Sequence, residues 1–151
     1  MKLSEHFSLE ELTRTDHRSL DNSPDPAALA NLHRLAAFLE QVRTALGDRM
    51  VVINSAYRSA AVNAACGSRE SSQHRLGCAA DIRVPGMTPD AVVKAVRASG
   101  LAYDQLIKEF DSWTHLSIPN LATAAPRKMA LIIDKTGTRL FPADPTRLAA
   151  G

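Results

Sequence analysis

The chain has 151 residues, of which 45% are hydrophobic and 23% are charged. These are ordinary values for one globular domain, and they exclude wholesale disorder, collagen-like repeats and a coiled coil. Eighteen basic and sixteen acidic side chains leave a formal net charge of +2. Because this charge creates no strong field for phosphate backbones, we expect no nucleic-acid partner.

Two further features concern the compartment in which the protein works. No stretch approaches the ~18 apolar residues of a membrane-spanning helix, and residues 1–6 turn polar before any signal-peptide core. We therefore expect no stable membrane association and synthesis in the cytoplasm. Cys66 and Cys78 are too few for a disulfide framework and match no paired-cysteine zinc module. Free thiols are the simplest interpretation, and a bridge stays open if the protein works in an oxidising space.

The sequence patterns of the first half of the chain predict mostly helices. Ser8 with two following glutamates predicts a short helix over 8–13, and the Asp- and Pro-rich segment 15–26 predicts a loop. Apolar residues at helical spacing then predict a long helix from Pro26 to Gly47. A β-branched run at 50–54 predicts a strand, and an alanine-rich stretch predicts a short helix over 59–65.

The second half is richer in strand patterns. Thr88, Pro89 and Asp90 predict the start of an amphipathic helix that runs to about Ser99. Two hairpins are expected, the first with its tight turn at 111–112 and the second with its turn at 135–137. The predicted strands span 79–84, 103–110, 113–118, 129–134 and 138–141.

This order of elements predicts an α+β fold. Helices should pack on one face of a small, mostly antiparallel sheet, and the other face is left to carry a site. No repeat, low-complexity tract or long linker divides the chain. We therefore expect a single domain over 1–151, with helices in its first half and the sheet with the active site in its second. The hairpin at 129–141 and the tail after it either close the sheet or narrow a cleft.

The most informative chemistry lies at His74, Asp81 and His115. Imidazole nitrogens and a carboxylate are good zinc ligands, and Gly77 lets the backbone bend so that His74 and Asp81 face one point. Two histidines and one carboxylate leave a fourth position open for water, which is typical of catalytic rather than structural zinc. Glu109 lies on the partner strand of the hairpin that carries His115, within reach of such a site.

Further motifs surround these residues in the sequence. They are Ser55-Ala56-Tyr57-Arg58-Ser59, Asn63, Ser72-x-His74-x-x-Gly77-x-Ala79-x-Asp81, and Glu109 with Trp113-x-His115. In order and spacing these segments closely resemble the M15 family of zinc peptidases that cut peptidoglycan. The resemblance covers roughly residues 1–120, and the opening from Leu3 to Leu12 is similar to the small phage-type branch. That family includes D-alanyl-D-alanine carboxypeptidases and phage endolysins of the L-alanyl-D-glutamate type.

The resemblance implies a role for each matching residue. It makes Glu109 the general base and Arg58 the group that holds the substrate or a developing oxyanion. One Zn²⁺ per chain would be bound by His74, Asp81 and His115, and the substrate cleft would be lined by Ser72, Gln73 and Trp113. Many relatives place the acid three residues before the last histidine, where this chain has Ser112. Asp111 is therefore the alternative base. Cys78, between two ligands, is interpreted as a packed thiol.

The function implied by the resemblance is hydrolysis of the peptidoglycan stem peptide by a monomeric zinc peptidase of the endolysin type. The bond stays open between an L-alanyl-D-glutamate endopeptidase and a D-alanyl-D-alanine carboxypeptidase. The alternative is a non-catalytic peptidoglycan-binding or structural module of the same fold. A wall enzyme made in the cytoplasm would need a holin or a virion to reach the cell wall.

Overall fold

The computed structural model describes residues 1–143 of the chain, and it contains four α-helices, one 3-10 helix and six strands in that range. The tail after the last hairpin, from residue 144 on, lies outside the described residues. In chain order the elements are α1 (Leu9–Thr13), α2 (Pro26–Ala45), β1 (Val52–Ser55), α3 (Ala60–Ala65), η1 (Gln73–Leu76), β2 (Ala79–Arg83), α4 (Pro89–Ser99), β3 (Gln105–Glu109), β4 (Trp113–Ser117), β5 (Met129–Asp134) and β6 (Gly137–Leu140).

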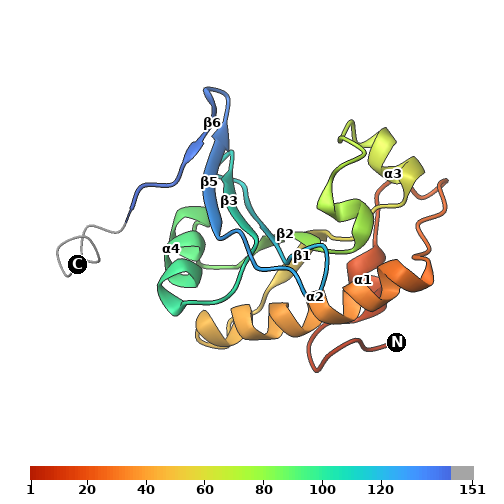
Figure 1. The fold of residues 1–151 in the computed structure, drawn as a ribbon, viewed down its shortest axis with the longest axis horizontal. Helices are drawn as coiled ribbons and strands as arrows, with labels where there is room; N and C mark the ends of the chain where they lie inside the picture. The colour runs from red at the N-terminus through yellow and green to blue at the C-terminus, as the bar shows by residue number, and fades with distance from the viewer. Residues whose placement is uncertain (144–151) are drawn as a thin grey trace.

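The six strands form one sheet in the order β1-β2-β4-β3-β5-β6. Every neighbouring pair is antiparallel except β3 and β5, which run parallel. Figure 1 shows α2 and α4 on one side of this sheet, while the β5–β6 hairpin extends away from the body of the molecule. The predicted α+β class, with helices on one face of a mostly antiparallel sheet, is confirmed.

The long helix α2 forms because its sequence supplies both a start and a buried face. The Asp25 side chain accepts a hydrogen bond from the Ala28 amide, and Pro26 occupies the first turn, where it loses no helical hydrogen bond. Apolar residues at helical spacing then turn inward toward α4 and the sheet. The buried residues of α2 are Ala28, Leu32, Leu35, Ala36, Phe38, Leu39 and Val42.

Alternation along the strands separates the two faces of the sheet. Ala80, Ile82, Leu106 and Leu116 are fully buried in the core beneath the helices. Their neighbours along the same strands point to the opposite face. Asp81 pairs with His115 across β2 and β4, and His115 pairs with Ile107 across β4 and β3. The open face therefore carries the polar residues in the middle of the sheet.

The turn of the first hairpin is one residue longer than predicted. Phe110 and Asp111 have φ values of 52° and 51°, and the Ser112 amide donates to the Glu109 carbonyl. Because Glu109 pairs with Trp113, the turn covers residues 110–112 and includes both predicted positions, 111 and 112. The added residue is Phe110, which was expected to end the strand because Phe is uncommon at positive φ. The structure also contains η1, which the sequence analysis did not predict.

The hairpin at 129–141 both completes the sheet and narrows a cleft. β5 continues the sheet beside β3, and its Leu131 and Ile133 line the open face. Both cysteines are free, Cys66 exposed and Cys78 buried, which confirms free thiols and a packed Cys78. No helix within residues 1–143 has the length and apolarity to cross a membrane.

Candidate metal centre

His74 is held in place by the short helix η1. At the start of η1, the Ser72 hydroxyl accepts a hydrogen bond from the His74 backbone amide. Gly77, with φ of 76°, ends this helix. A Cβ at Gly77 would lie 2.8 Å from the Ala28 carbonyl oxygen of α2. Glycine is required there both for the left-handed backbone and for the close approach to α2.

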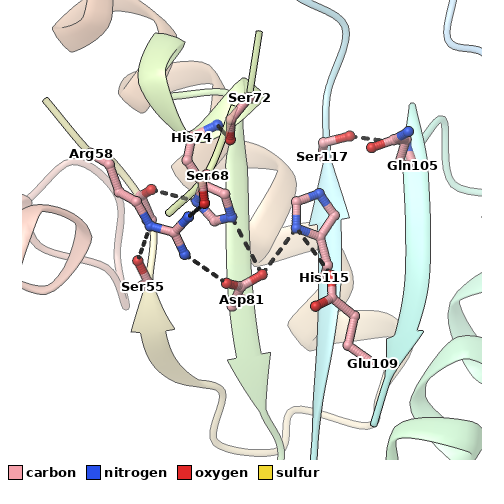
Figure 2. A network of polar contacts seen from close by, with 11 residues as sticks. Ser55, Arg58, Ser68, Ser72, His74, Asp81, Gln105, Glu109, His115 and Ser117 are labelled. Carbon is pink, nitrogen blue, oxygen red and sulfur yellow. Dashed lines mark hydrogen bonds and ion pairs between the residues drawn. The ribbon is translucent and has the colours of Figure 1, made fainter. Parts of the chain in front are cut away.

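Asp81 and His115 complete a group of three. They stand directly opposite each other on β2 and β4, so their side chains leave the same face of the sheet. Asp81 Oδ1 lies 3.0 Å from His115 Nδ1 and 3.4 Å from His74 Nε2, and the three candidate ligand atoms all lie within 4.8 Å of one another. Figure 2 shows the three side chains converging on one point.

The spacing and chemistry of this group fit a metal ion. Metal–ligand bonds of about 2.0–2.2 Å in a tetrahedron place neighbouring ligand atoms about 3.3–3.6 Å apart, close to the distances to Asp81 Oδ1. Two imidazoles and one carboxylate form a borderline donor set that suits Zn²⁺. Within residues 1–143 this is the one such group of His, Cys, Asp or Glu, and Cys78 is not part of it. A bound ion would keep a position open toward solvent.

The surroundings of the three residues prepare them to bind a cation. His74 Nδ1 lies 2.7 Å from the Ala56 carbonyl oxygen, which can only accept, so Nδ1 carries the proton and Nε2 is free to act as a ligand. Burial lowers the pKa of His74 and keeps it neutral. Burial opposes ionisation of Asp81, but the hydrogen bond with His115 holds the pKa of Asp81 well below its usual range. The group thus offers a neutral imidazole at His74 and an ionised carboxylate at Asp81.

Arg58 lines the cleft over the group beside Asp81, and its guanidinium is paired with neighbouring side chains. Its NH2 is 3.2 Å from Asp81 Oδ2, while its Nε donates to the Ser55 hydroxyl and its NH1 to the Ser68 hydroxyl. All three nitrogens therefore have partners. Since Oδ1 of Asp81 faces the histidines, Arg58 fixes the other carboxylate oxygen and orients the ligand.

Glu109 stands beside the group on β3. Its Oε1 lies 4.0 Å from His115 Nδ1, and Figure 2 places it on the side of His115 away from Arg58. Burial and the nearby negative charge of Asp81 raise the pKa of Glu109. The alternative base, Asp111, is exposed and pairs with Lys108 at 3.0 Å. Lys108 also approaches Asp90 at the start of α4, so Asp111 is drawn toward the helical face.

A cleft of about 670 Å³ opens over the group. The loop after α3 forms one wall, with the Asn63 side chain donating to the Arg69 carbonyl to brace it. Strands β3 to β5 form the floor and the other wall, which includes the predicted Trp113. Of the predicted cleft residues, Ser72 lines this cleft, but Gln73 is buried and lines an adjoining hollow.

Several contributors to the site were missed by sequence analysis. The Ala56 carbonyl orients His74, and Leu131 and Ile133 of β5 line the cleft. Strand alternation could have grouped Leu131 with Ile133, but nothing local indicated that β5 pairs with β3. The contact between Arg58 and Asp81 likewise joins residues far apart in the chain, for which the sequence holds no local signal.

Comparison with known protein families matches residues 5–117 to the Peptidase M15 family. No curated protein matches the chain. The matched region includes all three residues of the His-Asp-His group, and also Glu109 and Arg58. Members of this family are metal-dependent hydrolases of peptide bonds, in keeping with a metal-binding group at the floor of a cleft. The chain belongs to the Peptidase M15 family.

Proposed function

We propose that this protein is a zinc-dependent peptidase that hydrolyses the peptide stem of bacterial peptidoglycan, as an enzyme of the phage or prophage endolysin type. The observation that carries the proposal is the three-residue group with its free side toward the cleft and a buried carboxylate next to it. A structural zinc site would instead be closed by a fourth protein ligand. The group in residues 1–143 has three members.

The proposed mechanism assigns each residue a separate task. His74, Asp81 and His115 would hold Zn²⁺, which when bound supplies a Lewis acid that polarises the scissile carbonyl and activates water. Glu109 accepts the proton of the attacking water on its carboxylate and delivers it to the leaving amine nitrogen. Its raised pKa favours the first half of that transfer, because the carboxylate is a stronger base than usual.

Arg58 would act as a positioning residue. Its guanidinium keeps one oxygen of Asp81 occupied and leaves the other for the ion. The contacts with Ser55 and Ser68 hold the guanidinium in that orientation. Direct contact of Arg58 with the substrate or oxyanion, as the family resemblance implies, would have to use the N–H groups that these partners leave free.

The form of the cleft favours an endopeptidase over a carboxypeptidase. The hollow over the metal group continues past His115 into an adjoining hollow of about 620 Å³. The two hollows share Ser71, Ser72, Gln105 and His115. A substrate chain can therefore extend on both sides of the bond to be cut, which suits the L-alanyl-D-glutamate bond within a stem better than its terminal D-alanine.

Digestion of purified peptidoglycan by the zinc-loaded protein tests this proposal, with the fragments identified by mass spectrometry. We expect cleavage inside the stem by wild type, none by Glu109→Ala, and unimpaired cleavage by the matched control Asp111→Asn. Release of free D-alanine alone would instead identify a carboxypeptidase. No cleavage by wild type with zinc bound would favour the second candidate, a binding module of the same fold.

Partners and location follow from this proposal. A protein that works as a monomer on the stem peptide needs access to the wall, and we propose that a holin or a virion delivers it there from the cytoplasm. Co-expression with and without a membrane-permeabilising partner, with wall lysis as the readout, tests the delivery. Lysis that is equally fast without the partner would contradict the holin route.

A further inference from the structure

The hollow next to the metal group carries a charged side chain to which nothing above assigns a role. This hollow adjoins the cleft at His115, and the segment between β4 and β5 forms its outer wall. Arg127 is the one lysine or arginine that lines it among the described residues. Residue 127 also lies beyond the part of the chain that matches the family.

Arg127 is held rigidly although its side chain is 53% exposed. Its Nε and NH2 donate to the carboxylate of Asp104, the NH2 at 2.7 Å, and its backbone amide donates to the same carboxylate. Asp104 is only 3% exposed and also accepts a hydrogen bond from the buried amide of Gln73. Gln73 directly precedes the candidate ligand His74, so the guanidinium is tied to the backbone of the metal group.

One edge of the Arg127 guanidinium remains available. Asp104 takes the edge formed by Nε and NH2, and no residue among 1–143 is a hydrogen-bond partner of NH1. A guanidinium has five N–H donors and can bind two carboxylates on different edges. Because Asp104 has already fixed its orientation, little side-chain entropy is lost when the free edge binds a ligand.

We propose that Arg127 forms an anion subsite that recognises a carboxylate branch of the substrate next to the scissile bond. This inference rests on the proposed peptidase function and names the feature of the substrate that the cleft selects. Two other arginines line the cleft over the metal group but not this hollow. Arg58 already has an acidic partner in Asp81, and Arg69 lies in the loop after α3. A peptide with a free carboxylate on the His115 side of the cleft would meet the unoccupied edge of Arg127.

The test compares synthetic stem peptides that differ in one carboxylate. One peptide has all carboxylates free, one has the α-carboxyl branch of its D-glutamate as a carboxamide, and one has its C-terminus as a carboxamide. Steady-state kinetics are measured for wild type and Arg127→Gln. We expect the variant to lose about 10- to 100-fold in kcat/KM, mainly through KM, on the peptides that keep the recognised carboxylate. On the peptide that lacks it, wild type and variant should differ less than threefold.

A matched control separates charge recognition from structural support. Arg139 on β6 also pairs with an aspartate, Asp134, and its side chain is 51% exposed, but it lines neither hollow. Arg139→Gln should leave the preference among the three peptides unchanged, whereas Arg127→Gln abolishes it. Because the preference is a ratio within one protein, a loss of stability that lowers all rates alike does not affect it.

Three outcomes would overturn the inference. An equal loss on all three peptides would show that Arg127 only supports the fold, and no loss on any would show that it plays no part. If wild type cleaves none of the peptides, the proposed function fails, and the inference is decided by binding alone. Calorimetry with Glu109→Gln then measures binding without cleavage, and equal Kd values for all three peptides would rule out the subsite independently.

Discussion

The two faces of the sheet are built from the same strands and have opposite chemistry. Toward α2 and α4, the middle strands present fully buried apolar side chains such as Leu106 and Leu116. Toward the cleft, the same strands present Asp81, Glu109 and His115, which are poorly exposed. His115 Nδ1 lies 3.0 Å from Asp81 Oδ1 and 4.0 Å from Glu109 Oε1. One face stabilises the fold. The other brings the carboxylates of Asp81 and Glu109 close together, and their negative charges repel each other until a cation binds.

Glu109→Gln should show the largest effect, a loss of activity together with a gain in thermal stability. Loss of the proton acceptor is expected to lower kcat by about 10²–10⁴-fold, while the metal-free variant melts at a higher temperature than metal-free wild type at neutral pH. The pKa of Glu109 is raised on folding, so the ionised form is disfavoured in the folded state. Its contribution to stability is present below the unfolded pKa and is lost as pH rises through the folded pKa.

Calorimetric scans at several pH values check this prediction. The gain in melting temperature from Glu109→Gln should be larger at pH 7 than near pH 4, where the carboxyl is protonated in both states. A variant that is less stable than wild type at pH 7 would show that Glu109 supports the fold.

Leu106→Ala tests the helical face. The side chain is fully buried against the core, so its truncation should lower the free energy of unfolding by about 2–5 kcal/mol. Denaturant titration measures the loss. Well below the melting transition, the kcat of the folded protein should stay close to wild type, because Leu106 points away from the cleft. A large fall in kcat there would show that the two faces are coupled through β3.

Removal of metal should have a smaller effect on stability. Zinc at about 100 times its Kd should stabilise the protein by about 2.7 kcal/mol, and a chelator should reverse this. Asp81→Asn is expected to abolish the response, because one ligand and the partner of Arg58 are lost together. Thermal melts of wild type and Asp81→Asn with and without zinc measure the stabilisation by zinc. A full response in the variant would place the binding site elsewhere.

Asp111→Gly should give the smallest change, and in the stabilising direction. Asp111 has φ of 51° in the turn that follows Glu109, where a non-glycine residue costs about 1–2 kcal/mol. We expect a gain of about 1 kcal/mol in the free energy of unfolding, less what is lost with the Lys108 ion pair. Chemical denaturation measures the gain. A net loss would mean that the ion pair outweighs the relief of strain.

Local features of the sequence determined where several helices start and which residue types form the metal group. The caps at Ser8 and Thr88 and the first-turn Pro26 start helices as predicted, because these signals depend on residues within one turn. The His-Asp-His group was also predictable, since the residue types and the order of the motif carry the chemistry. Strand alternation placed Asp81 and His115 on one face, and the register of β2 and β4 brings them directly opposite each other.

Only the tertiary structure decided how distant segments support that group. The parallel pairing of β5 with β3, the contact of Arg58 with Asp81, and the hold of Asp104 on Arg127 all join residues far apart in the chain. Such contacts depend on which surfaces meet after the helices and strands have formed, and no local pattern encodes that choice. The turn at Phe110 and Asp111 shows the same principle, because the pairing of β3 with β4 overrides the weak preference of those residues for a left-handed backbone.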